Sequence, residues 1–276
     1  MNFSLSDKKV GFIGMGNMGQ AILSALMESG TLEANQVFVH NRTPGKAQKM
    51  VKKYGVKDLS TPEEVVESAD IIILGTKPQD LLALLEPLRQ IFTSEKVAIS
   101  LAAGVQLSTL KKYATEAHWV RLIPNTPIFV QRAVVNFCLA KPDLILEKLV
   151  KKLFSPLGHV VSLEEGEEFS AMMVASSSGT GFIFELMKYW QDWIEDYGID
   201  SDEARKIVTE TFLGSALLAT EDQQSSFDQL IQKVASKKGV TAAGLESMRE
   251  LELEGLMRMS FNKALMRDKQ LAKENS

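Results

Sequence analysis

The sequence predicts a doubly wound α/β domain at the N-terminus and an all-α domain at the C-terminus. Short apolar runs alternate with helical patterns in the first part, which predicts parallel strands joined by crossover helices. The runs are KVGFI, QVFVH, DIIIL, KVAIS and WVRLI. They are apolar throughout, as expected for a sheet covered on both faces. After residue 163 the chain becomes acidic and then helical in pattern. We therefore expect domains at 1–163 and 164–276.

Local signals place several helices. Thr61 is a candidate N-cap, Pro62 suits the first helical position, and Glu64 is placed to complete a capping box. Apolar residues recur at helical spacing in GFIFELMKYWQDWIEDYG, EARKIVTETFLGSALLA and SFDQLIQKVAS. The proline-free stretch 241–271 predicts one long helix. Because these helices have narrow polar faces, we expect them to pack against one another and against a second subunit.

Composition argues against several functional classes. The 276 residues carry a net charge of -4 and contain no long basic block, which makes a nucleic-acid partner a poor expectation. No stretch approaches the roughly 20 apolar residues that cross a bilayer, and the N-terminus lacks a signal pattern. We expect a cytoplasmic protein without a membrane partner. The three histidines are scattered and Cys138 lies in an apolar run, so we predict no metal site and a buried thiol.

The most specific local motif is VGFIGMGNMGQAI. Gly14, Gly16 and Gly19 form GxGxxG directly after a predicted strand and at the start of a predicted helix. This context is typical of a Rossmann-type dinucleotide site, in which the helix N-terminus faces the pyrophosphate. The alternative is a glycine-rich turn without a ligand. The predicted cofactor contacts here are Gly14, Met15, Gly16, Asn17, Met18 and Gly19.

The end of the second predicted strand indicates which cofactor binds. An NAD site usually has an acid at this place, which accepts hydrogen bonds from the ribose. Here the strand is followed by Asn41, Arg42 and Thr43. Arg42 would pair with a 2′-phosphate, and Asn41 and Thr43 would donate hydrogen bonds. We therefore predict NADPH in preference to NADH; the alternative is that Arg42 is a solvated loop charge.

Five motifs together resemble one known family. GFIGMGNMGQAI, HNRT, GTKPQ, SLAAGV and RLIPNTP occur in the order seen in pyrroline-5-carboxylate reductases, and the helical second half follows the same plan. The first two motifs also occur in 3-hydroxyacid dehydrogenases, but the catalytic lysine arrangement of that family is not found here. The resemblance implies NADPH-dependent reduction of 1-pyrroline-5-carboxylate to L-proline by a homodimer or higher homo-oligomer.

The later motifs lie just past the carboxyl ends of predicted strands, where ligands bind in open parallel sheets. The alternative interpretation of Lys77 is a solvated lysine at the start of a helix, where a cation is unfavourable. The additional predicted cofactor contacts are Thr76, Lys77, Pro78, Ala102, Ala103, Gly104 and Asn125.

The resemblance also implies a substrate loop at SKKGVT. In the family, a turn resembling Ser-Pro-Gly-Gly-x-Thr joins two helices and binds the substrate carboxylate through backbone amides. The lysines at 237 and 238 replace the proline and the first glycine of that pattern. We predict Thr241 as the catalytic residue that orients the imine nitrogen. The predicted substrate contacts are Ser236, Lys238, Gly239, Val240 and Thr241.

Two departures leave alternatives open. Besides the two lysines, the stretch 176–181 reads SSSGTG where the family has approximately SGSGPA. Both lie in the half that selects the substrate. The alternatives are a related reductase acting on another cyclic imine or a carbonyl compound, and a non-catalytic NADPH-binding protein.

Overall fold

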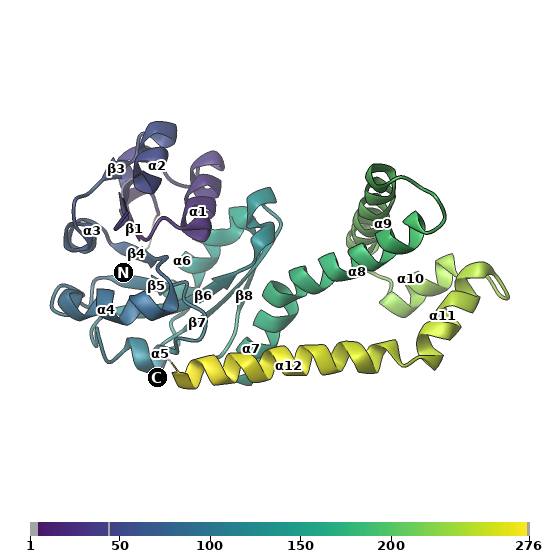
Figure 1. Ribbon diagram of the computed structural model, residues 1–276. Coiled ribbons are helices and arrows are strands. Elements are labelled where there is room, and N and C mark those ends of the chain that lie inside the picture. The colour runs from purple at the N-terminus through teal and green to yellow at the C-terminus, as the bar shows by residue number, and fades with distance from the viewer. Residues whose placement is uncertain (1–4, 44, 275–276) are drawn as a thin grey trace. The chain divides into compact units, whose positions relative to one another are not determined.

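The computed structural model describes residues 5–43 and 45–274, which form two compact units (Figure 1). The first unit comprises residues 1–178 and 264–276, and the second comprises 179–263. The chain therefore leaves the first unit after Ser178 and returns to it within its last helix. The first unit is the predicted doubly wound α/β domain, and the second is helical.

One eight-stranded sheet forms the centre of the first unit, with the order β3-β2-β1-β4-β5-β6-β7-β8. All neighbouring strands are parallel except β6 and β7. The strands are β1 (Val10–Ile13), β2 (Val37–His40), β3 (Lys57–Asp58), β4 (Ile71–Leu74), β5 (Val97–Ser100), β6 (His118–Pro124), β7 (Ala133–Leu139) and β8 (Gly158–Ser162). The five predicted strands are confirmed, and β3, β7 and β8 are additional. Strand order reverses between β1 and β4, where such sheets bind ligands.

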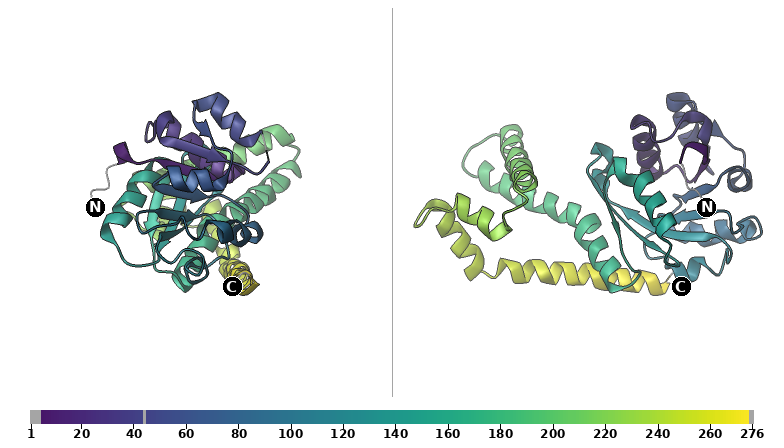
Figure 2. Two further views of the ribbon diagram at one scale, coloured as in Figure 1. Left: turned by 90° about the vertical axis from the view of Figure 1, so that its left-hand side faces the viewer. Right: turned by 180° about the vertical axis from the view of Figure 1, so that it is seen from behind.

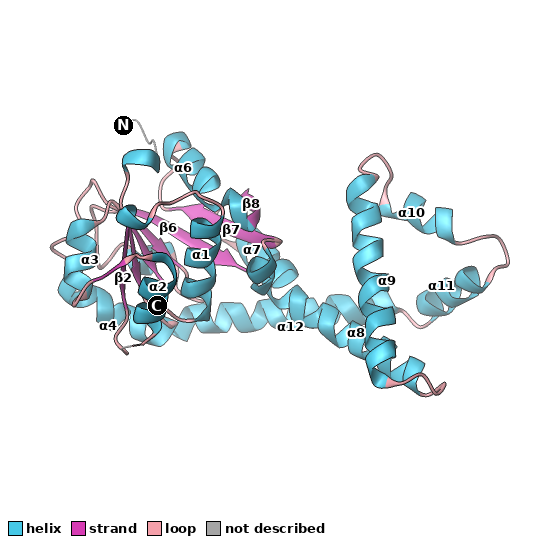
Figure 3. Ribbon diagram, turned by 90° about the horizontal axis from the view of Figure 1, so that it is seen from above, coloured by secondary structure: helices cyan, strands magenta, loops and turns pink. Residues whose placement is uncertain are grey.

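Helices cover both faces of this sheet (Figure 3). Its α-helices are α1 (Asn17–Glu28), α2 (Lys46–Tyr54), α3 (Pro62–Ser68), α4 (Pro78–Leu88), α5 (Leu107–Leu110), α6 (Leu144–Phe154) and α7 (Glu167–Met173). Short 3₁₀ turns are η1 (Leu5–Asp7), η2 (Ala34–Gln36), η3 (Thr126–Val130) and η4 (Ser155–Leu157), and η5 (Val174–Ser178) is π-helical. Apolar residues of α1, α2 and α6 pack in one core, and those of α3, α4, α5 and α7 pack in the other.

At the start of α3, one of the two predicted capping contacts is confirmed and the other differs. Thr61 caps the helix as predicted, because its hydroxyl accepts a hydrogen bond from the Glu64 backbone N–H at 3.2 Å. The predicted reciprocal bond is different: the Glu64 carboxylate accepts from the backbone N–H of Ser60 at 2.9 Å. The cap therefore forms one residue wider than the capping box.

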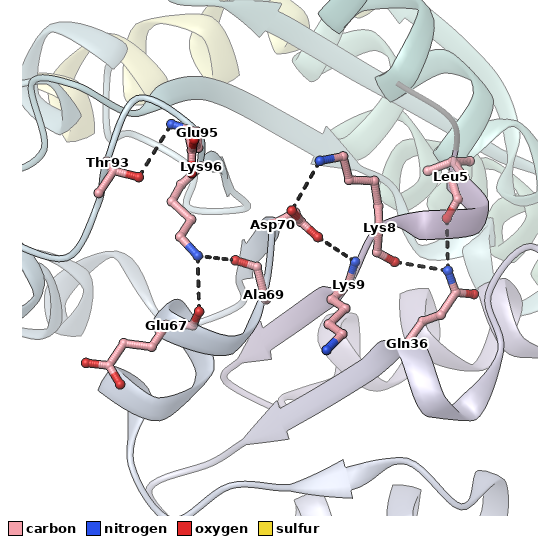
Figure 4. Close-up of polar contacts among 10 residues, drawn as sticks. All are labelled: Leu5, Lys8, Lys9, Gln36, Glu67, Ala69, Asp70, Thr93, Glu95 and Lys96. Carbon is pink, nitrogen blue, oxygen red and sulfur yellow. Dashed lines mark hydrogen bonds and ion pairs between the residues drawn. The ribbon is translucent and has the colours of Figure 1, made fainter. Parts of the chain in front are cut away.

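Polar contacts close the edge of the sheet at the amino ends of its strands (Figure 4). The Asp70 carboxylate accepts from the Lys8 ammonium at 3.1 Å and from the Lys9 backbone N–H at 2.8 Å. Lys96 donates to the carbonyls of Glu67 and Ala69 at 3.2 and 2.8 Å. These contacts join the starts of β1, β4 and β5, so the amino edge is structural and the carboxyl edge remains for a ligand.

Cys138 is fully buried in β7, as the sequence predicts. Burial raises the pKa of its thiol to about 12, so the thiol stays protonated at neutral and mildly alkaline pH. We expect no reaction of the native protein with a thiol reagent at pH 8, and one equivalent of reaction after denaturation. Rapid labelling of the native protein would contradict this burial.

The second unit contains helices α8 (Gly179–Glu195), α9 (Ser201–Glu221), α10 (Phe227–Val234), α11 (Val240–Glu250) and the first part of α12 (Leu253–Glu274), which Figure 2 shows from two further sides. The predicted single helix over 241–271 is wrong, because the chain breaks at Leu251 and Glu252. Glu252 has φ of 52°, in the left-handed region that ends a right-handed helix. The lack of proline in this stretch predicts a continuous helix, and no other feature of the sequence indicates the break.

The first unit extends beyond the boundary expected after residue 163. Phe169 and Met173 of α7 are buried in the same core as α3, α4 and α5. The Asp268 carboxylate of α12, which is 7% exposed, accepts from the Ser170 hydroxyl at 2.7 Å. These contacts place α7 and the end of α12 with the sheet, although both lie in the helical half of the sequence.

Candidate active site

Three glycines interlock at the carboxyl ends of β1 and β4. Gly14 has φ of +98°, and a Cβ there would lie 2.7 Å from the carbonyl carbon of Gly75. A Cβ on Gly19 or on Gly75 would lie 2.5 Å from the carbonyl oxygen of Gly14. Distances below 3 Å to backbone leave no room for a side chain, so the fold itself requires these glycines. Gly75 is the first residue of the GTKPQ motif, but the sequence analysis assigned it no role.

Gly16 differs from these three. A Cβ there would meet nothing nearer than the Gly75 carbonyl oxygen at 3.9 Å, and its φ is -66°. Gly16 is also the N-cap of α1 and provides no side-chain cap. The protein packing therefore does not require a glycine here, whereas close approach of a ligand to the helix N-terminus does. This open, uncapped turn fits a dinucleotide pyrophosphate.

A pocket of about 450 Å³ opens beside this turn. It brings together seven predicted cofactor residues: Gly14, Gly16, Asn41, Arg42, Thr43, Thr76 and Lys77. The Thr76 hydroxyl oxygen is buried and has no hydrogen-bond partner among the described residues, which fits a polar group of a bound ligand. The lining also includes Lys46, Gly75, Asp80, Ala83 and Leu84, which the sequence interpretation did not select.

Asn41 connects the two loops of the pocket. Its side-chain oxygen accepts from the Met15 backbone N–H at 2.8 Å, and its amide donates to the Thr43 carbonyl at 2.7 Å. Its first function is therefore to hold the glycine turn against the loop after β2. The Met15 side chain is fully buried, so only its backbone is available to a cofactor. Arg42 is 84% exposed, and its guanidinium lies 3.7 Å from the Asp80 carboxylate.

The remaining predicted cofactor residues do not line this pocket and lie in segments that follow β1, β4, β5 and β6. Asn17, Met18 and Gly19 lie in the first turn of α1, and Pro78 is the first residue of α4. Ala102, Ala103 and Gly104 form the loop after β5, where Gly104 has φ of 72°. Each position agrees with the predicted carboxyl edge, and its contact with a cofactor stays a prediction.

Hydrogen bonds hold both ends of the loop after β5. The Ala102 backbone N–H donates to the Ser100 hydroxyl at 3.3 Å, and the Leu107 backbone N–H donates to both Glu165 oxygens at 2.9 and 3.2 Å. Glu165 also pairs at 3.3 Å with Arg121, whose side chain is 4% exposed. The Arg121 guanidinium lies over the Phe169 ring, 4.7 Å from its centroid. This buried charge cluster was not predicted from the sequence.

Asn125 contacts protein groups through both ends of its amide. Its oxygen accepts from the Val134 backbone N–H at 2.9 Å, and its nitrogen donates to the Ser176 carbonyl at 3.1 Å. The Asn136 amide donates to the Ser176 hydroxyl at 2.7 Å. The departure at 176–181 therefore begins in the π-helical turn η5, where Ser176 accepts hydrogen bonds from Asn125, just after β6, and from Asn136 of β7. A cofactor contact of Asn125 would use its second amide hydrogen or its backbone.

The predicted substrate residues gather in the second unit, at the turn between α10 and α11. Gly239 is the N-cap of α11, and its backbone N–H donates to the Ser236 carbonyl at 2.9 Å. A Cβ on Gly239 would lie 2.3 Å from the Ser236 hydroxyl oxygen and 3.1 Å from the Ser236 carbonyl oxygen, so a side chain there would displace the Ser236 side chain. Lys238 has φ of +61°, and it therefore adopts the backbone shape that favours the glycine of the family pattern. Val240 and Thr241 begin α11 and are exposed.

The fold and the glycine-lined pocket are those of a dinucleotide-binding protein. The family model described as pyrroline-5-carboxylate reductase dimerisation matches residues 166–271, and the model described as NADP oxidoreductase, coenzyme F420-dependent, matches residues 9–104. A pyrroline-5-carboxylate reductase of Methanosarcina acetivorans is 30% identical over 274 residues, covering 98% of this chain and 100% of the relative. This chain belongs to the pyrroline-5-carboxylate reductase family.

Two solved structures share the fold of this chain. A pyrroline-5-carboxylate reductase from Coxiella burnetii matches with a TM-score of 0.90 and 28% identity, covering 96% of this chain and 98% of that chain. The Plasmodium falciparum enzyme with NADP bound matches with a TM-score of 0.85 and 21% identity, covering 98% and 100%. At 21% identity, the match to the Plasmodium falciparum enzyme shows a shared fold only. In the part of the chain that the structure describes, no three His, Cys, Asp or Glu side chains are grouped to hold a metal ion.

Proposed function

We propose that this chain reduces 1-pyrroline-5-carboxylate to L-proline with NADPH. The family membership across 98% of the chain carries this proposal. The glycine turn supports it, because Gly16 has space that the fold does not need and a pyrophosphate would use. The test is NADPH oxidation by the purified protein with 1-pyrroline-5-carboxylate, with NADH in parallel. Turnover of this imine supports the proposal, and binding of NADPH without turnover of any imine contradicts it.

The cofactor half of the site follows from residues of the first unit. The backbone at Gly14 and Gly16 and the N-terminus of α1 would hold the pyrophosphate. Arg42 and Thr43 would bind the 2′-phosphate, and the loop Ala102–Gly104 would face the nicotinamide. Bound NADPH supplies the hydride. The protein's tasks are then to align the imine carbon, to hold the carboxylate and to exclude water.

Arg42 is the residue on which the cofactor preference rests. Replacing Arg42 by Asp exchanges a group that attracts a 2′-phosphate for one that repels it and accepts from a ribose hydroxyl. We expect the ratio of kcat/KM for NADPH to that for NADH to fall by about 100-fold or more, since a charge-assisted contact is worth about 1.5–3 kcal/mol before the added repulsion. Lys57→Asp changes a cation in β3 outside the pocket and serves as the control. An unchanged ratio in Arg42→Asp would refute the assignment.

Thr241 is the proposed catalytic residue. We propose that the amides at the start of α11 bind the carboxylate and that the Thr241 hydroxyl orients the imine nitrogen. A protonated imine is already electrophilic and a threonine hydroxyl is a weak acid, so Thr241→Ala should lower kcat about 10- to 100-fold without abolishing it. Thr241→Ser should recover most of the rate. Complete loss of activity in a folded Thr241→Ala protein would assign this residue a larger role.

A second candidate function is reduction of a different cyclic imine or a carbonyl compound. The Lys238 conformation favours it, because the loop keeps a glycine-like backbone at φ of +61° while carrying a long cationic side chain. A substrate with a second anionic group would gain from that cation. Comparing kcat/KM for 1-pyrroline-5-carboxylate and for larger cyclic imino acids separates the two candidates.

We also propose that the protein is a homodimer or a higher homo-oligomer. Large apolar side chains of the second unit are exposed, including Phe184 at 64%, Trp193 at 63% and Met259 at 68%. Such a surface is typical of an obligate contact, and the matched family model is described as a dimerisation domain. A monomeric mass by light scattering at micromolar concentration would contradict the proposal. No described helix is long and apolar enough to span a membrane, and the cytoplasmic location stays a prediction.

A further inference from the structure

The cofactor pocket contains an acid at an unexpected place. Among the described residues that line it, Arg42, Lys46 and Lys77 are cationic and Asp80 is acidic. Asp80 lies in the first turn of α4, and Arg42 lies in the loop that follows β2. Its carboxylate oxygen lies 3.7 Å from the Arg42 guanidinium. The pair therefore bridges two walls of the pocket that are separate in the sequence.

We propose that Asp80 limits the preference for NADPH by competing with the 2′-phosphate for Arg42. This inference rests on the proposed function, in which Arg42 binds that phosphate. Arg42 has one guanidinium, and its Asp80 partner is already within ion-pair distance. A 2′-phosphate must therefore share or displace Asp80, and the two anions repel each other. NADH has a 2′-hydroxyl in place of this phosphate. Its binding therefore neither displaces Asp80 from Arg42 nor brings a second anion close to Asp80.

The exposure of the pair sets the size of the effect. The side chains are 84% and 39% exposed, so the pair by itself contributes little to folding stability. The repulsion between Asp80 and a dianionic phosphate is also screened by water and salt. We therefore expect a change in cofactor affinity of about 3- to 10-fold when the Asp80 charge is removed, since exposed charge contacts are worth at most about one tenfold step.

A simpler role for Asp80 is support of its own helix. An acid in the first turn of α4 interacts favourably with the helix N-terminus. That role predicts a lower melting temperature for a neutral variant and the same change in affinity for both cofactors. The competition role predicts opposite behaviour: tighter binding of NADPH and nearly unchanged binding of NADH.

The experiment measures dissociation constants by titration of NADPH and NADH at fixed ionic strength. Asp80→Asn keeps the size of the side chain and removes its charge. We expect NADPH to bind about 3- to 10-fold more tightly and NADH to change less than about twofold. Competition by 2′,5′-ADP and by 5′-AMP should show the same difference, which places the effect at the phosphate. Glu86→Gln is the matched control, because it removes one charge from α4 at an exposed pair with Arg89, outside the pocket.

A double variant tests the dependence on Arg42. In the Arg42→Ala background, Asp80→Asn should raise NADPH affinity less than it does when Arg42 is present, because only the screened repulsion between Asp80 and the phosphate remains. An equal change in both backgrounds would overturn the competition. So would an unchanged NADPH-to-NADH affinity ratio in Asp80→Asn, and in both cases the proposed function would stand if the unsubstituted protein binds and uses NADPH. Failure of the unsubstituted protein to bind either cofactor would overturn the proposed function as well.

Discussion

Gly14→Ala is expected to lower the free energy of unfolding by about 2–5 kcal/mol. The new Cβ would lie 2.7 Å from the Gly75 carbonyl carbon and 2.8 Å from the Thr76 backbone nitrogen, and φ at this position is +98°. A left-handed alanine costs about 1–2 kcal/mol and the overpacking adds about 1–3 kcal/mol. Denaturant unfolding measures the loss, and poor soluble expression would be its extreme form.

Gly16→Ala is the matched control two residues away. Because the nearest atom is 3.9 Å from the new Cβ, we expect a stability change within about 1 kcal/mol. The same Cβ would occupy the space offered to the pyrophosphate, so NADPH binding should weaken about tenfold or more. A stable Gly14→Ala protein, or a Gly16→Ala protein with normal NADPH affinity, would contradict the division between fold and ligand.

Glu165→Ala is expected to lower the free energy of unfolding by about 2–4 kcal/mol. It would leave the buried Arg121 guanidinium without its carboxylate and the Leu107 N–H without its acceptor. Arg121 already has a buried Nε without a described partner, so loss of Glu165 would leave its guanidinium with still fewer hydrogen bonds. Thermal and denaturant unfolding measure the effect.

Two variants separate charge from geometry at this position. Glu165→Gln retains an acceptor for Leu107 and removes the charge opposite Arg121, so it should lose less stability than Glu165→Ala. Glu164→Ala changes the exposed neighbour and should stay within about 0.5 kcal/mol. Equal stability of Glu164→Ala and Glu165→Ala would show that the buried cluster contributes nothing.

The fold and the cofactor edge could be predicted because their signals are local. Alternating strand and helix patterns predict a parallel sheet, and GxGxxG between a strand and a helix locates the pocket. The prediction extended to Arg42, Thr76 and Lys77, which all line that pocket. Each of these residues lies within three positions of the carboxyl end of β2 or β4, so the sheet topology alone brings them together.

The missed features depend on contacts between distant residues. Gly75 must be glycine because the backbone of Gly14 approaches it closely. Asp80 affects the pocket because its carboxylate lies 3.7 Å from the Arg42 guanidinium. No periodicity in the sequence records either approach. β7 is similar: it returns antiparallel to β6 through η3, although its apolar run resembles the parallel strands. The break at Glu252 needs a left-handed residue that is not glycine, for which composition gives no signal.

The return of α12 to the first unit has a consequence for how the chain can be divided. Residues 179–263 are inserted between two segments of the first unit and do not simply follow it. The insertion begins where η5 meets α8 and ends inside α12. Truncating this chain from residue 276 backwards would remove Asp268 and Lys269 before any of the second unit, and with them the partners of Ser170 and Glu167. A separate cofactor-binding fragment would therefore consist of two pieces, 1–178 and 264–276, and a duplicated or exchanged helical part would have to enter between them.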